Sequence, residues 1–280
     1  MSFLATGTTN YNSRIARAGT LAERYPFAAS VLIFYARVAD FQRTFSEQLP
    51  QRWGQERTRA GANGEFRVPL KTEIVLEPFA EFLQVVEAAG PQPLADAAST
   101  LSRSSASERN ELLAEFWKTG LRESSELDSK ARLWQFLARA FLQPYAEFVA
   151  GAMLPPALPM TACRCPHCNS LPLLGVLRPE GDGGKRFLVC SFCSLEWEFR
   201  RIFCAQCGEE SEGKLPVYIA EEFPHVRVEC CEACRHFLRT IDLTKDGHAV
   251  PLVDDLAAIP LTLWADEHGY KRIQANLLAT

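Results

Sequence analysis

Eight of the ten cysteines in this 280-residue chain form Cys-x-x-Cys pairs, and no cysteine precedes residue 163. The pairs are Cys165/Cys168, Cys190/Cys193, Cys204/Cys207 and Cys231/Cys234. Two intervening residues let both sulfurs face one ion, and four sulfurs in a tetrahedron select zinc or iron. The order pair–loop–pair, repeated once, predicts two four-cysteine metal sites. A crossed arrangement, with each site built from alternate pairs, remains open.

Other residues near the pairs bear on the same prediction. The residue after the second cysteine of such a turn often needs a positive φ, which suits Gly208 and, next best, Asn169. Cys163 and Cys230 are expected to be passive small residues, although a spare ligand or a reactive thiol is an alternative. His167 lies inside a Cys-x-x-Cys turn, where side chains usually face solvent, so we do not assign it as a ligand.

The metal sets the role of such sites. Structural zinc contributes about 10–16 kcal/mol of apparent folding free energy at neutral pH, more than a small module's core supplies. Iron in the same ligands adds a redox couple. Dithiol chemistry of the thioredoxin kind needs a Cys-x-x-Cys that opens a helix beside a βαβ unit, and the sequence suggests none.

The cysteine-rich half is predicted to consist of short strands. Apolar runs alternate with turn formers at Leu173–Leu177, Arg186–Val189, Trp197–Phe203, Val217–Ala220, Val226–Glu229 and Phe237–Leu243, with a turn at Gly181–Gly184. Hairpins of this size bury little apolar surface, so they need a metal or a disulfide.

The first half is predicted to be helical, because apolar residues recur at three- and four-residue steps. The longest stripe runs from Phe27 to Leu49, just after Pro26. Ser107 is expected to cap a helix that Gly120 ends. Pro78 is expected to open a further helix, and Pro144 to kink or interrupt another.

These patterns predict an α+β protein: a multihelical N-terminal domain, two small rubredoxin-like or zinc-ribbon-like modules and a short C-terminal helix. We expect Asp254 to cap that last helix, with Asp255 beside it, and Pro260 to delay its start. The expected boundaries are a helical domain at 1–154, a Pro-rich linker at 155–162, metal modules at 163–203 and 204–243, and a C-terminal segment at 244–280.

The charge and hydropathy of the chain argue against two classes of protein, nucleic-acid binders and membrane-spanning proteins. The net charge is -4, and residues 163–240 hold ten Lys and Arg against eleven Asp and Glu. A nucleic-acid-binding zinc ribbon is therefore disfavoured, because phosphate contacts need clustered cations. The longest apolar stretch, Ala28–Ala36, is far shorter than the ~20 residues that span a bilayer. Without a secretory signal at the N-terminus, we expect a cytoplasmic protein.

The second half resembles the formate dehydrogenase accessory protein family (FdhE). The resemblance rests on Cys165–Gly175, Lys185–Gly208, Cys231–Arg239 and Pro251–Ala257, and more loosely on Arg24–Gln42 and Phe141–Ala150 in the first half. The run from Cys190 to Trp197, Cys-x-x-Cys-x-x-Glu-Trp, is particularly similar. Asn169 stands where the family usually has Gly, and Cys163 and Cys230 are not part of its pattern.

The resemblance implies two rubredoxin-like modules that bind iron through the eight paired cysteines. It also implies a cytoplasmic accessory protein, chaperone-like rather than enzymatic. Such a protein binds the catalytic subunit of respiratory formate dehydrogenase, which is exported by the twin-arginine route after its cofactors are inserted. A rubredoxin-like electron carrier, or a redox agent acting on the client, is the alternative.

Residues between the two sites are the candidate contacts with the client. They are Glu196, Trp197, Arg200 and Arg201. The alternative is that Trp197 packs between the modules while the charged side chains are solvated.

Overall fold

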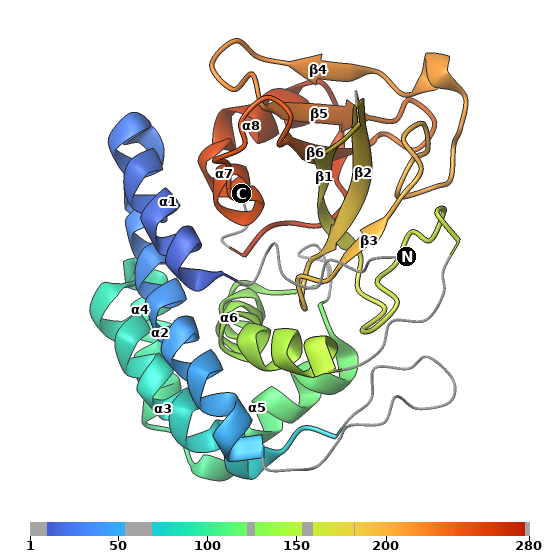
Figure 1. Ribbon diagram of the computed structural model, residues 1–280. Helices are drawn as coiled ribbons and strands as arrows, with labels where there is room; N and C mark the ends of the chain where they lie inside the picture. The colour runs from blue at the N-terminus through green and yellow to red at the C-terminus, as the bar shows by residue number, and fades with distance from the viewer. Residues whose placement is uncertain (1–9, 54–68, 122–126, 153–158, 182, 278–280) are drawn as a thin grey trace.

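The computed structural model describes residues 10–53, 69–121, 127–152, 159–181 and 183–277. Helices occupy the first half and form the lower and left part of Figure 1. Their bounds are α1 Tyr11–Arg24, the 3₁₀ turn η1 Pro26–Ala28, α2 Ala29–Trp53, α3 Thr72–Ala89, α4 Gln92–Ser102, α5 Ala106–Thr119 and α6 Ser129–Ala152. The predicted helical half is thus confirmed, whereas residues 155–158 of the expected linker lie outside the described residues.

The N-cap of α5 is Ser105, so the assignment to Ser107 was wrong. The Ser105 hydroxyl accepts a hydrogen bond from the Glu108 N–H, and the Glu108 carboxylate accepts one from the Ser105 N–H. This reciprocal capping box satisfies two backbone donors at once, which a cap at Ser107 would not do. Gly120 ends the helix as expected, with φ of 72°.

Pro78 does not open a helix as expected, and Pro144 does not interrupt one. Helix α3 begins at Thr72, ahead of Pro78, and α6 continues through Pro144. Proline lacks an N–H, so Pro144 leaves the carbonyl of Ala140 without its usual helical donor. The buried amide of Gln42 in α2 donates to that carbonyl at 2.6 Å. A neighbouring helix therefore supplies the missing hydrogen bond.

The second half forms one sheet with the order β3-β2-β1-β6-β5-β4, and β7 pairs with β6. The strands are β1 Pro172–Glu180, β2 Gly183–Cys190, β3 Glu196–Glu198, β4 Val217–Ile219, β5 Val226–Cys230, β6 His236–Asp242 and β7 Lys271–Arg272. The predicted strands are confirmed, but β3 ends at Glu198 instead of Phe203. Strands β1 and β6 pair in parallel, so both cysteine modules contribute to one sheet.

The C-terminal segment holds two helices where one was expected. They are α7 Pro251–Ala257 and α8 Ile259–Glu267, with Pro260 in the first turn of α8. The N-cap of α7 is Val250, so the cap predicted at Asp254 was wrong. Asp254 lies in the first turn and accepts the Val250 N–H at 2.7 Å.

The helices supply the core that the hairpins lack. One buried cluster joins α2–α6 to the first cysteine site, and a second joins α1 and α2 to β5, β6 and α7. Among the described helices, none has the length and apolarity that crossing a bilayer requires.

Candidate metal centres

The first cysteine cluster contains Cys165, Cys168, Cys190 and Cys193, whose sulfurs lie within 4.8 Å of one another. The Sγ atoms of Cys168 and Cys190 are 3.3 Å apart, and those of Cys165 and Cys193 are 3.6 Å apart. Four sulfurs at about 2.3 Å from a zinc ion lie about 3.8 Å from each other. The cluster therefore has the dimensions of a tetrahedral thiolate site.

The second cluster contains Cys204, Cys207, Cys231 and Cys234 at the same spacing. Its Sγ atoms are 3.7 Å apart both for Cys204–Cys234 and for Cys207–Cys231. These separations are far above the roughly 2.05 Å of a disulfide. Pairs that follow each other in the chain share a cluster, which excludes the crossed arrangement.

Each Cys-x-x-Cys turn has the same backbone geometry. The N–H of the first cysteine donates to the carbonyl five residues later, as from Cys165 to Ser170 at 2.9 Å and from Cys231 to His236 at 2.9 Å. The residue after the second cysteine has a positive φ in all four turns: Asn169 56°, Ser194 53°, Gly208 80° and Arg235 57°. Gly208 and Asn169 are confirmed. Ser194 and Arg235 could have been inferred from the same spacing.

Burial differs between the two clusters. In the first, Cys165, Cys190 and Cys193 are all buried, whereas Cys207 of the second is exposed and Cys234 is half-buried. Burial raises the pKa of the Cys190 thiol well above its ordinary value. Hydrogen bonds with the Cys165, Cys190 and Cys193 side chains lower the pKa of Cys168 well below its ordinary value.

In the second cluster, too, the pKa of one thiol is raised and that of another is lowered. Burial raises the pKa of Cys204 to about 11. Burial also acts to raise the pKa of Cys207, but hydrogen bonds led by the Glu209 N–H lower it overall. Metal binding would deprotonate the cysteine thiols and release their protons, because thiolates are the ligands.

The first cluster is fastened to α6. Arg139 donates to the carbonyl of Ser191 at 2.9 Å, and the Ser194 hydroxyl donates to Glu147 at 2.6 Å. The ring of Phe192 packs edge-on against Phe116 of α5 at 5.4 Å. The Cys190–Cys193 turn therefore forms part of the joint between the helices and the sheet.

Glu147 extends this joint to the first helix. Its carboxylate also accepts a hydrogen bond from Tyr11 at 2.7 Å and forms an ion pair with the buried Arg14 at 2.9 Å. A buried carboxylate is tolerated when such partners compensate its charge. Helices α1 and α6 and a ligand-bearing turn thus meet at one carboxyl group.

A cavity of about 460 Å³ lies beside the second cluster. Cys204, Cys230 and Cys231 line it, together with Arg201 and Ile202. Cys230 is buried in β5, and burial raises the pKa of its thiol to about 12. That thiol is protonated at neutral pH, which favours a passive role.

The remaining predicted residues occupy distinct environments. His167 is buried, so the expectation that it faces solvent was wrong, because its turn is packed within the molecule. Trp197 is also buried, and its Nε1–H donates to the carbonyl of Ala162 at 2.8 Å. Glu196 forms an ion pair with Arg178 at 2.7 Å. Arg200 and Arg201 are exposed.

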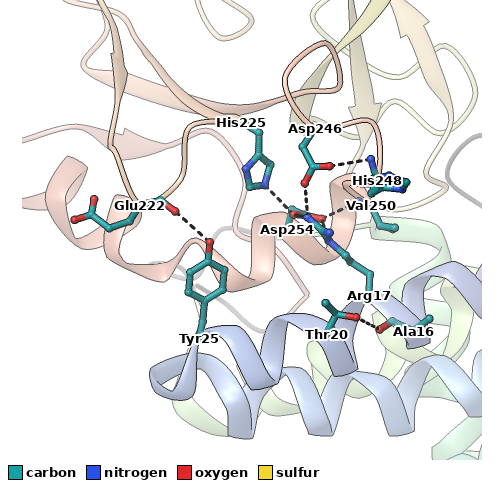
Figure 2. Close-up of polar contacts among 10 residues, drawn as sticks. All are labelled: Ala16, Arg17, Thr20, Tyr25, Glu222, His225, Asp246, His248, Val250 and Asp254. Atoms are coloured by element: carbon teal, nitrogen blue, oxygen red, sulfur yellow. Dashed lines mark hydrogen bonds and ion pairs between the residues drawn. The ribbon is translucent and has the colours of Figure 1, made fainter.

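A third group, missed by sequence reasoning, brings His225, Asp246 and Asp254 together (Figure 2). The Asp254 carboxylate accepts a hydrogen bond from the Arg17 guanidinium at 2.6 Å and lies 2.8 Å from Nε2 of His225. The Asp246 carboxylate accepts a hydrogen bond from the same guanidinium at 2.9 Å. Arg17 already supplies the cation that these carboxylates need. The group therefore acts as a clamp between α1 and α7. Its residues are far apart in the sequence, so no local spacing predicts it.

Comparisons with known proteins point to one family. Residues 164–201 match the domain described as FdhE, central domain, and residues 202–279 match FdhE, C-terminal domain. The chain is 25% identical over 270 residues to a protein named "Protein FdhE homolog" from Aquifex aeolicus, covering 94% of this chain and 93% of that one. A protein of the same name from Pseudomonas aeruginosa is 38% identical over 122 residues, 41% of this chain and 38% of that one.

A solved structure supports the same relationship over the whole fold. The crystal structure of the FdhE protein from Pseudomonas aeruginosa has a TM-score of 0.67 and 25% sequence identity with this chain. The match covers 96% of this chain and 95% of that one, so it includes the helical half.

Proposed function

Because this chain belongs to the FdhE family, we propose that it is a non-enzymatic maturation factor for a respiratory formate dehydrogenase. It binds the catalytic subunit in the cytoplasm before export. The family supports the accessory role in formate dehydrogenase activity. The features of the molecule that bear on the mechanism are the two cysteine clusters and the surface beside the second one.

The eight paired cysteines are the proposed ligands of two metal ions, one for each cluster. The tetrahedral spacing of the sulfurs and their backbone N–H donors support this assignment. The family resemblance favours iron, and zinc fits the same ligands. A bound ion supplies the positive charge that four neighbouring thiolates require.

The proposal that the client docks beside the second cluster is supported by the position of that cluster at the surface. Cys207 is exposed, and Arg201 and Ile202 line the adjoining cavity. Arg200 forms an exposed ion pair with Glu210, which contributes little stability and can be exchanged for a partner's carboxylate. Since Glu196 and Trp197 are engaged internally, Arg200 and Arg201 are the residues proposed to contact the client.

Exposure of Cys207 also favours the second candidate, a rubredoxin-like electron carrier, since electron transfer needs close approach to the metal. A visible-range spectrum separates the two functions. Iron held by four thiolates is coloured and bleaches on reduction. A colourless protein that holds stoichiometric zinc in cells would contradict electron transfer.

Co-purification tests the maturation function. The wild-type chain is expected to capture the formate dehydrogenase catalytic subunit, and an Arg200→Glu/Arg201→Glu variant to capture much less. Arg103→Glu is the matched control, because it reverses the charge of an exposed side chain on the helical half, and it should capture the subunit as the wild type does. If the chain never captures that subunit, and its deletion leaves formate oxidation unchanged, the proposal is wrong.

A further inference from the structure

Strand β4 lies at the end of the sheet and carries three exposed apolar side chains. It is the outermost strand in Figure 1, with β5 on its inner side. Val217 is 48% exposed, Tyr218 39% and Ile219 56%. Proteins usually protect an edge strand with charges or a covering segment, because its free backbone groups can pair with another chain.

The register shows which backbone groups of β4 are free. Pro216 accepts the N–H of Cys230 at 2.9 Å, and Lys214 accepts that of Glu232 at 2.9 Å. In an antiparallel pair the hydrogen-bonded residues alternate, so Tyr218 bonds to β5. The N–H and C=O groups of Val217 and Ile219 therefore point away from the sheet.

The opposite edge of the sheet is protected. Strand β3 carries Glu198, which pairs with Lys185 at 2.9 Å, alongside the Glu196 ion pair. The segment at 160–162 lies beside this edge, since Trp197 of β3 donates to the Ala162 carbonyl at 2.8 Å and the N–H of Arg200, just beyond the strand, donates to the Met160 carbonyl at 2.8 Å. In the part of the chain that the structure describes, none of the three β4 side chains is charged, and no backbone hydrogen bond joins another segment to the outer side of the strand.

Acidic residues flank β4 at both ends. Glu212 precedes it, and Glu221 and Glu222 follow it, all exposed. Within the described residues, none of these three carboxylates has an ion-pair partner, whereas Glu209 pairs with Lys214. In Figure 2 the carboxylate of Glu222 points away from the other labelled residues, and only its main-chain oxygen accepts a hydrogen bond, from Tyr25.

The neighbouring cations do not neutralise this surface. Arg227, opposite Ile219, pairs with Asp242 at 2.6 Å. Arg201 lies on the wall of the cavity beside the second cluster, which Val217 also lines. A strand added to β4 would place every second side chain on the cavity side, next to Val217 and Ile219.

We propose that β4 is a docking edge for an extended segment of a partner protein, with apolar residues at alternate positions and Lys or Arg at both ends. The segment joins the sheet through the backbone groups of Val217 and Ile219, which is β-strand addition. A second copy of this chain is a poor partner, because it would bring its own Glu212, Glu221 and Glu222 against the same carboxylates. We assign this segment to the client, the formate dehydrogenase catalytic subunit, and only that assignment rests on the proposed function.

Fluorescence anisotropy with a labelled peptide, Arg-Val-Thr-Ile-Thr-Val-Lys, tests the edge on the full metal-loaded chain. Binding is expected to weaken about tenfold, about 1.4 kcal/mol, in Ile219→Lys and in Ile219→Pro. The proline removes the outward N–H but leaves the bonds to β5 intact. Ile33→Lys on α2 is the matched control, because Ile33 is equally exposed at 56%, and it should bind as wild type.

A peptide with Glu at both ends should bind more weakly than the basic one. Of two peptides N-methylated at alternate residues, only the one whose methyl groups replace the amide hydrogens that face β4 should fail to bind. Equal binding to wild type and Ile219→Lys, or no binding to wild type, overturns the inference. Concentration-dependent dimers lost in Ile219→Lys would also overturn it, in favour of self-pairing. Capture of the catalytic subunit without peptide binding refutes the docking edge alone, whereas peptide binding without capture refutes the maturation function alone.

Discussion

Several charged side chains lie inside this protein, and most of them pair with an opposite charge, whereas Arg139 donates to backbone carbonyls. Asp255 is fully buried and contacts Arg239 at 2.8 Å and Arg272 at 2.6 Å, while Asn276 donates to it at 3.1 Å. Burial acts to raise the pKa of Asp255, but the two guanidinium groups outweigh it and hold the pKa below its ordinary value. The carboxylate therefore links β6, α7 and the C-terminal segment.

Asp255→Asn should lower the free energy of unfolding at pH 7 by about 3–5 kcal/mol, because it leaves buried cations without their partner. Since the folded pKa is depressed, this stability is present above the unfolded pKa of about 3.9 and is lost as pH falls through the folded value. Urea titrations from pH 7 to pH 3 measure it. The wild type should lose stability over the acidic part of this range and the variant should lose less, whereas parallel profiles would contradict the prediction.

At the scale of elements, the parallel pair β1–β6 joins the two cysteine modules. Gly175 lies opposite Thr240 in this pair, and a Cβ added at Gly175 would come closer to the Thr240 hydroxyl oxygen than van der Waals contact allows. The glycine therefore allows the close approach of the two strands. This contact depends on the parallel register, which the hairpin pattern of the sequence does not contain.

Gly175→Ala should destabilise the protein by about 1–3 kcal/mol through overpacking against Thr240. Adding Thr240→Ala removes the hydroxyl and should recover part of the loss, which thermal or urea unfolding measures. Gly213→Ala is the control, because nothing lies within 4 Å of its added Cβ. A Gly175→Ala variant as stable as the wild type would mean that the two strands do not approach so closely.

For the whole molecule, the two clusters occupy unlike positions. The first is enclosed between the helices and the sheet and shares its core with α2–α6. The second lies near the surface, with Cys207 exposed. We therefore expect the first ion to hold the two halves together and the second to exchange with solvent ligands more readily.

Metal release to a chelator should be biphasic, with the fast phase from the second cluster. Cys207→Ser should remove only the fast phase and Cys190→Ser only the slow one, as followed with a colorimetric chelator. Cys190→Ser should also loosen the joint at α6 and raise amide exchange there. Cys163→Ser, outside both clusters, is the control and should retain both phases; a single phase in the wild type would contradict the asymmetry.

The sequence alone determined the features that depend on near neighbours. Each cysteine turn closes through hydrogen bonds within five residues, so spacing predicts the turns and the positive φ at Asn169 and Gly208. Helix periodicity is equally local, so the apolar stripes located the helical half. The capping box at Ser105 was present in the sequence too, as Ser-x-x-Glu.

Only the tertiary structure decided how distant segments meet. It placed consecutive pairs in one cluster, buried His167 and Trp197, and paired β1 with β6. The continuity of α6 depends on Gln42, about a hundred residues away, and the clamp at Asp254 depends on Arg17. Such contacts join side chains that no periodicity relates, because their positions follow from how the helices pack on the sheet.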